Sequence, residues 1–173
     1  MFIMNYHLVS SVNKYLHQKL INNLCSLDRY NVGFKCTYLY RIPIIRIKYN
    51  MMDKELSKKC KYIITYIKTE EELNKVMNYG IQIIGIVFRN YHDSVNNLPQ
   101  SLKLLEIFGD NFNHPVNQLP QSLKSLKIRG DYFNQLLDKL PQSLKSLKIQ
   151  GNNFDQSLDK LPQSLKLIII RGN

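Results

Sequence analysis

The sequence predicts an α+β repeat protein: a leucine-rich-repeat-like solenoid with a parallel sheet of about five to six short strands, preceded by a small helical N-terminal module. Three observations lead to this fold class. The pentapeptide Leu-Pro-Gln-Ser-Leu begins at residues 98, 119, 140 and 161, a repeat length of 21 residues. Each unit carries a Leu-x-Ile step of period two, which is typical of a strand. One such unit cannot bury its own apolar face, so the units must stack.

The repeats are predicted to occupy residues 77–173, in units that start at residues 77, 98, 119, 140 and 161. The first unit lacks the proline and is aligned with the others by apolar residues at the same spacing. These are Ile81, Ile84, Ile86, Tyr91 and Val95. In the later units Phe112, Phe133 and Phe154 are expected to stack as a spine inside the coil. A glycine follows each strand, and we expect it to permit the turn.

The units resemble the FNIP repeat, a leucine-rich-repeat-like family named for a Phe-Asn-Ile-Pro segment and abundant in social amoebae and giant DNA viruses. The matching residues are Phe112, Asn113, Pro115, Val116, Leu119, Pro120, Ser122, Leu123, Leu126, Gly130 and Phe133. The resemblance implies a non-enzymatic scaffold for protein–protein interaction that needs no cofactor.

The N-terminal part, residues 1–76, shows no repeat. It is predicted to divide into a helical module over residues 1–50 and a capping unit over 51–76. Apolar residues in 7–27 recur at helical spacing, and Asp28 is expected to start a second helical stretch that runs to residue 39. Residues 41–50 and 62–67 are strand candidates. Thr69 followed by three glutamates predicts a short helix over 70–76.

Residues 20–43 resemble a divergent F-box. The matching positions are Leu20, Ile21, Leu24, Asp28, Val32, Phe34, Cys36, Leu39 and Ile42. The resemblance implies that Leu20, Leu24 and Phe34 contact a Skp-type adaptor of a cullin ubiquitin ligase, with the chain as the substrate-recognition subunit. The alternative is a helical cap that only protects the end of the solenoid. The three cysteines, Cys25, Cys36 and Cys60, indicate reduced thiols and hence the cytoplasm, or the host cytoplasm if the protein is viral.

The sequence contains no pattern that predicts catalysis, a metal site or a membrane span. The four histidines are scattered, the three cysteines form no CxxC pair, and no glycine-rich phosphate-binding motif is present. No apolar run approaches the roughly 18–20 residues that cross a bilayer. We therefore expect a non-enzymatic protein that works through its surface.

The expected working surface is the outer face of the sheet, formed by residues that alternate with the inward strand positions. These residues are Lys103, Glu106, Phe108, Lys124, Lys127, Arg129, Lys145, Lys148, Gln150, Lys166, Ile169 and Arg171. The formal net charge is +11, but its lysines reflect an AT-rich coding bias, so the first interpretation of this face is a solvated surface. The functional interpretation is a site for an acidic protein partner, and the third is a nucleic-acid site. Acidic residues within the repeats and the scarcity of aromatic residues on this face disfavour nucleic acid.

The last strand is predicted over residues 167–171, and no capping unit follows it in this sequence. Ile168, Ile169 and Ile170 make it the most apolar strand of the set. An uncovered strand presents unpaired backbone groups and an open edge of the core. We therefore expect this edge to self-associate or to dock a partner.

Overall fold

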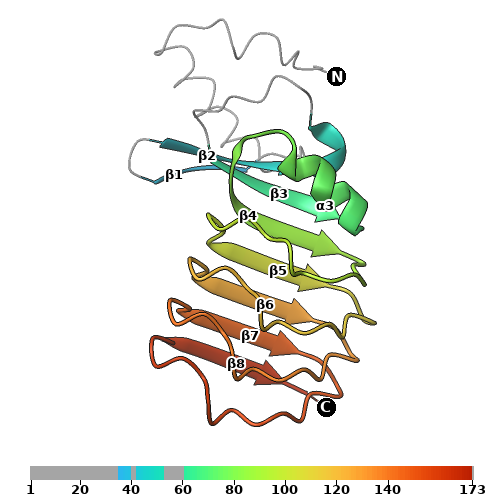
Figure 1. Ribbon diagram of the computed structural model, residues 1–173, viewed down its shortest axis with the longest axis vertical. Coiled ribbons are helices and arrows are strands. Elements are labelled where there is room, and N and C mark those ends of the chain that lie inside the picture. The colour runs from blue at the N-terminus through green and yellow to red at the C-terminus, as the bar shows by residue number, and fades with distance from the viewer. Residues whose placement is uncertain (1–34, 40–41, 53–60, 173) are drawn as a thin grey trace, which may run out of the picture.

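The computed structural model describes residues 35–39, 42–52 and 61–172, which form one sheet of eight strands stacked in chain order (Figure 1). The strands are β1 (Lys35–Leu39), β2 (Ile42–Lys48), β3 (Lys61–Ile67), β4 (Gln82–Arg89), β5 (Leu104–Phe108), β6 (Ser125–Arg129), β7 (Ser146–Gln150) and β8 (Leu167–Arg171). β1 and β2 are antiparallel, and every later pair is parallel. The helix α3 (Glu70–Met77) links β3 to β4, and a 3-10 turn, η2 (Tyr49–Met51), follows β2.

The predicted solenoid is confirmed by the register of the last four strands. Leu105 pairs with Leu126, Leu126 with Leu147, and Leu147 with Ile168, so each residue lies beside its counterpart 21 positions later. The return segments run along one side of the sheet (Figure 1). Every turn of the coil therefore repeats the same packing, and the core continues from one turn to the next.

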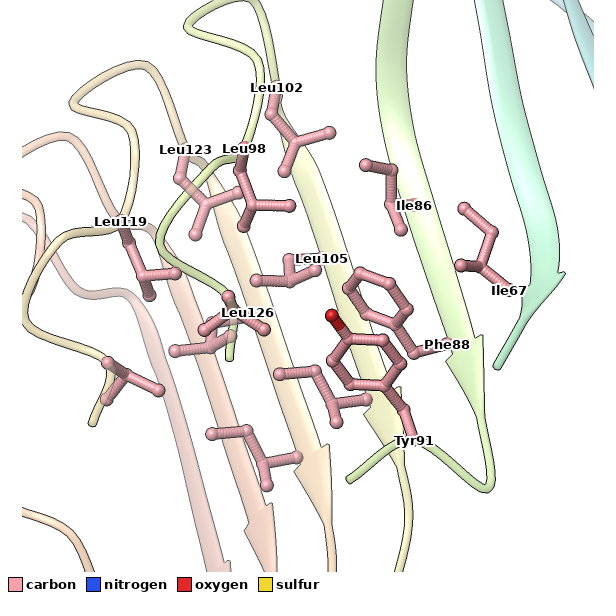
Figure 2. Close-up of a cluster of buried hydrophobic side chains, with 14 of the residues drawn as sticks. Ile67, Ile86, Phe88, Tyr91, Leu98, Leu102, Leu105, Leu119, Leu123 and Leu126 are labelled. Carbon is pink, nitrogen blue, oxygen red and sulfur yellow. The ribbon is translucent and has the colours of Figure 1, made fainter. Parts of the chain in front are cut away.

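The core lies between the sheet and the return segments, where apolar side chains converge from both (Figure 2). Leu98 and Leu102 approach from the return path, and Leu105 approaches from β5. The aromatic spine is present as predicted, with centroids 5.9 Å apart for Phe112 and Phe133, and 6.0 Å apart for Phe133 and Phe154. Phe154 is only half-buried because fewer residues cover the last turn.

Two ladders of side-chain hydrogen bonds join successive turns in addition to the sheet. The serine of each Leu-Pro-Gln-Ser-Leu segment donates to a backbone carbonyl of the preceding turn, as Ser122 does to Leu102 at 2.6 Å. On the return path Asn113 Oδ1 accepts the backbone N–H of Asn134 at 2.9 Å, and Asn134 Oδ1 accepts that of Asp155 at 3.2 Å. The polar residues of the repeat thus satisfy backbone groups that the sheet leaves unpaired.

The repeated glycines serve close packing between turns, which corrects their expected role in permitting the turn. Gly109, Gly130 and Gly151 do not have positive φ angles. A Cβ atom added at Gly130 would lie 2.5 Å from the carbonyl oxygen of Gly109, well inside contact distance. The space between stacked bends therefore admits no side chain at this position.

The first repeat is also corrected, because its strand is shifted by two residues relative to the predicted alignment. Ile86 pairs with Leu105 and Phe88 with Ile107, so Ile86 and Phe88 take the inward positions that we expected for Ile84 and Ile86. Tyr91 nevertheless reaches the spine position, 6.5 Å from Phe112. The strand runs directly into Tyr91 through Asn90, whose φ of 50° makes the bend without the Gly-Asp pair of later units.

The N-terminal predictions are confirmed in part. β2, β3 and α3 form where expected, and the Thr69 hydroxyl accepts the backbone N–H of Glu72 at 3.2 Å as the helix cap. The helical expectation is wrong for Lys35–Leu39, which form β1. Only two residues separate β1 from β2, so the two can pair locally, and this segment contains β-branched and aromatic residues that suit a strand. Residues 1–34 lie outside the described residues, and the proposed domain boundaries stay a prediction.

Candidate partner-binding face

The register places the predicted face residues in rows that run across the strands on the side opposite the core. The middle row consists of Val87, Glu106, Lys127, Lys148 and Ile169. The row nearest the carboxyl ends of the strands, here the carboxyl row, consists of Arg89, Phe108, Arg129, Gln150 and Arg171. Each row brings together residues that are about one repeat apart in the sequence.

The four lysines lie one residue before the strands, outside the paired register, and form a row at the amino ends of the strands, here the lysine ladder, which consists of Lys103, Lys124, Lys145 and Lys166. The third row of outward strand positions consists instead of Leu104, Ser125, Ser146 and Leu167. All four lysines are exposed. The backbone N–H of each of the last three lysines donates to the carbonyl oxygen of the lysine before it, at 2.8–2.9 Å. Adjacent strands lie about 4.8 Å apart, so the ladder aligns like charges at close range. This repulsion costs stability unless an anionic group offsets it.

A β-bulge brings an aromatic side chain that the sequence analysis did not assign to the face. The register between β3 and β4 shifts between Thr65 and Ile67, which leaves Tyr66 as the extra residue. Tyr66 has a φ of 67°, a left-handed conformation that is strained for a bulky residue, and its side chain is 47% exposed. The bulge directs the Tyr66 ring toward the basic side chains of the neighbouring strands.

These side chains form a basic–aromatic cluster of Lys48, Tyr66, Arg89, Phe108 and Lys127. The guanidinium carbon of Arg89 lies 3.8 Å from the Phe108 ring centroid and 5.7 Å from that of Tyr66. Lys48 Nζ lies 5.0 Å from the Tyr66 centroid, and Lys127 Nζ lies 4.8 Å from the Phe108 centroid. Cations at such distances are attracted by the ring faces. The cluster therefore continues the positive face beyond the repeats to β2.

The sequence analysis missed Lys48, Tyr66 and Arg89 as face residues. Arg89 pairs with Phe108, a relation that a constant 21-residue alignment hides because the two are 19 residues apart. The bulge at Tyr66 left no signal in the alternation of residues 62–67. Only Lys48, within the strand candidate over residues 41–50, and Arg89, in the first repeat unit, could have been found by extending the face to the N-terminal strands.

Two shallow depressions lie at the carboxyl ends of the strands. The first, of about 170 Å³, is lined by Arg89, Asn90, Phe108, Gly109, Asp110 and Arg129. The second, of about 310 Å³, is lined by Arg129, Asp131, Gln150, Gly151, Asn152, Arg171 and Gly172. Both have two arginines and one aspartate on their walls. An anionic side chain is the ligand that these walls suit best.

Within residues 35–39, 42–52 and 61–172, no cluster of three or more metal-ligating side chains is present. No helix of this same part of the chain is long and apolar enough to cross a membrane. The predicted adaptor contacts Leu20, Leu24 and Phe34 lie outside the described residues. Cys36, which the F-box resemblance places on a helix, lies in β1.

Residues 94–130, 115–140 and 133–172 match the family model of the FNIP repeat, so the matches together span residues 94–172. They begin close to the first Leu-Pro-Gln-Ser-Leu segment and end at the last described strand. No curated protein shows significant similarity to the chain.

Proposed function

Because residues 94–172 are FNIP repeats, we propose that the outer face of their sheet binds an acidic protein partner and that the chain acts as a non-enzymatic scaffold. The observation that carries the proposal is the lysine ladder, four exposed lysines in register over four turns. A partner that supplies carboxylates would relieve the repulsion within this row. A solenoid presents such a row on a rigid, extended surface, which suits recognition of another protein.

The mixture of residues on the face also supports a protein partner. Aromatic and arginine side chains are enriched at protein interfaces, and Phe108, Tyr66 and Arg89 lie together at one end of the face. The lysines would guide an acidic partner toward the face and the aromatic residues would provide contact area. The face thus combines electrostatic attraction with a compact apolar contact.

The test is charge reversal on the face compared with charge reversal on the return path. Lys124→Glu with Lys145→Glu changes the ladder, and Lys139→Glu with Lys160→Glu makes the same change of net charge at exposed residues of the return path. A photo-crosslinking residue at position 148 identifies the partner in an extract of the source organism's cells. We expect the ladder variant to lose the crosslinked partner and the return-path variant to keep it. Equal capture by both variants would show that the face is not the binding site.

We further propose the more specific role of a substrate-recognition subunit that docks a Skp-type adaptor. Its support is the resemblance of residues 20–43 to an F-box, and the strand at Lys35–Leu39 weakens that support because the resemblance implies a helix there. Co-purification of the adaptor with the full chain, and its loss in Leu20→Asp with Leu24→Asp, would support the role. A chain that never retains the adaptor would leave the N-terminal segment as a cap.

Self-association through β8 is a second proposal with its own observation. Leu167 and Ile168 are 41% and 48% exposed, although the residues paired with Ile168 in earlier strands are buried. A second copy could cover these side chains and pair with the strand edge. Sedimentation across concentrations should then show a dimer that Ile168→Lys abolishes. A monomer at every concentration for both proteins would exclude edge pairing.

A further inference from the structure

Three arginines occupy alternate positions of the carboxyl row. Arg89, Arg129 and Arg171 are separated by Phe108 and Gln150. Adjacent strands lie about 4.8 Å apart, so the Cα atoms of successive arginines are about 9.6 Å apart. Arg129 lines both depressions, while Arg89 lines the first and Arg171 the second. A ligand that crosses the strands would therefore meet an arginine on every second strand.

The guanidinium groups have unused binding capacity. Among the described residues, none of the three has a carboxylate within salt-bridge distance. The Nε atom of Arg89 is buried and has no hydrogen-bond partner. The same guanidinium lies over the Phe108 ring at 3.8 Å, which restricts its movement before any ligand arrives. A restricted guanidinium loses little freedom on binding, and a carboxylate is a ligand that it can hold through two hydrogen bonds.

We propose that this arginine row binds an acidic peptide in the polyproline II conformation, with a carboxylate side chain at every third residue. The proposal rests on the proposed function, since it names the segment of the protein partner that occupies the face. A polyproline II helix has three residues per turn and rises about 3.1 Å per residue. Residues i, i+3 and i+6 therefore lie on one side at intervals of about 9.3 Å, which matches the arginine spacing.

Other backbone conformations match the arginine row less well. In a strand, residue i+3 points to the opposite side from residue i, so only one of the two could reach the row. In an α-helix, residues i, i+7 and i+14 share a side at intervals of about 10.5 Å. Over two intervals the helix exceeds the arginine spacing by about 2 Å, whereas polyproline II falls short by less than about 1 Å.

The acidic residues beside the row favour a peptide over a nucleic acid. Asp110 lies on the wall of the first depression and Asp131 on the wall of the second. Glu106 lies in the adjacent middle row. A nucleic acid strand carries a phosphate at every nucleotide and would meet these carboxylates. A peptide with neutral residues between its acidic ones can place its charges against the arginines and avoid the aspartates.

The experiment compares two peptides of identical composition by fluorescence anisotropy with the full chain. The first is three repeats of Glu-Pro-Pro, and the second has the same residues with the three glutamates adjacent; both have blocked termini. We expect the first to bind at least about fivefold more tightly, since only its carboxylates match the row. A single-stranded oligothymidine of similar length serves as the nucleic-acid probe.

Variants assign the binding to the row. Arg129→Gln should weaken binding of the regular peptide about tenfold, as expected for loss of a charge-assisted pair. Lys139→Gln removes the same charge from the return path and should change binding less than about twofold. Arg129 is exposed, so the fold should not depend on it, and circular dichroism checks this. Arg89→Lys keeps the charge but loses the planar fork, and we expect about fivefold weaker binding.

Three outcomes would overturn the proposal: equal affinity of the two peptides, tighter binding of the oligothymidine, or equal effects of Arg129→Gln and Lys139→Gln. The crosslinking experiment separates this failure from failure of the proposed function. If the peptides fail but the partner still crosslinks at position 148 and is lost from the ladder variant, the face binds protein and only the peptide assignment is wrong. If both experiments fail, the face is not a protein-binding site.

Discussion

The rings of Phe112 and Phe133 stack with centroids 5.9 Å apart and planes inclined by 11°, although 21 residues separate them in the sequence. Both side chains are fully buried. The stack continues to Phe154, whose ring is inclined by only 3° to that of Phe133. One repeat therefore supplies a contact to each neighbour, and loss of a central ring removes packing on both sides.

Phe133→Ala should lower the free energy of unfolding by about 3–5 kcal/mol, the usual cost of deleting a buried phenylalanine side chain. Phe154→Ala is the matched control, since Phe154 is half-buried and contacts only one neighbouring ring of the spine. We expect the control to cost less than half as much. Urea titration followed by circular dichroism measures both. A loss below about 1 kcal/mol for Phe133→Ala would contradict the central position of this ring.

Much of this fold could be predicted because the repeat unit is nearly constant from residue 98 onward. Leu105, Leu126 and Leu147 lie at one spacing, and that spacing alone fixes the register of their strands. The predicted register was wrong for the first unit, where the bend after the strand is shorter than in later units and Ile86 and Phe88 take the inward positions. A bend of different length leaves the hydrophobic pattern almost unaltered, so the sequence did not reveal this shift.

The candidate site was predictable only where it repeats. Lys124 and Lys145 follow from the unit, whereas Tyr66 reaches the face through a bulge in a strand with no repeat partner in sequence. A bulge reverses the side on which a residue lies without changing the composition of its segment. The strand at Lys35–Leu39 was missed because its antiparallel pairing with β2, across only two connecting residues, overrides the helical spacing of its segment.

Gly130→Ala should destabilise the chain by about 1–3 kcal/mol, the range for forcing extra volume into a packed site. The added methyl group would meet the carbonyl oxygen of Gly109, which accepts the backbone N–H of Phe112 at 2.9 Å in the bend and cannot move away without disturbing that bond. Gly172→Ala is the control, because its nearest neighbour would be 3.3 Å away at the exposed end of the stack. Thermal unfolding of both variants measures the difference. Equal stability would show that adjacent bends can separate.

Tyr66 should reveal its backbone strain through a comparison of glycine and alanine at the same position. At a φ of 67° we expect Tyr66→Gly to be more stable than Tyr66→Ala by about 1 kcal/mol, since only residues with a Cβ are strained there. Glu106 has no positive φ, and the same two substitutions there should rank in the opposite order. Urea titration of the four variants gives both differences. If glycine and alanine follow the same order of stability at both positions, the strained bulge at Tyr66 is contradicted.

Tyr91 should make stability fall at alkaline pH. Its ring stacks on Phe88 with centroids 3.9 Å apart, and its hydroxyl donates to the carbonyl oxygen of Ser94 at 2.7 Å. Burial, reinforced by the negative charges of Asp93 and Glu70, raises the pKa of Tyr91 well above its usual range. The unfolded chain releases this proton near pH 10 and the folded chain does not, so the stabilisation is complete below about pH 10 and is lost as the pH rises above it.

Between pH 8 and 10.5 the wild type should lose about 1 kcal/mol more than Tyr91→Phe, which has no proton to release. Tyr132→Phe, at a side chain that is 58% exposed, should lose as much as the wild type. Urea titrations at the two pH values measure these losses, and parallel losses in all three proteins would mean that Tyr91 ionises freely in the folded chain.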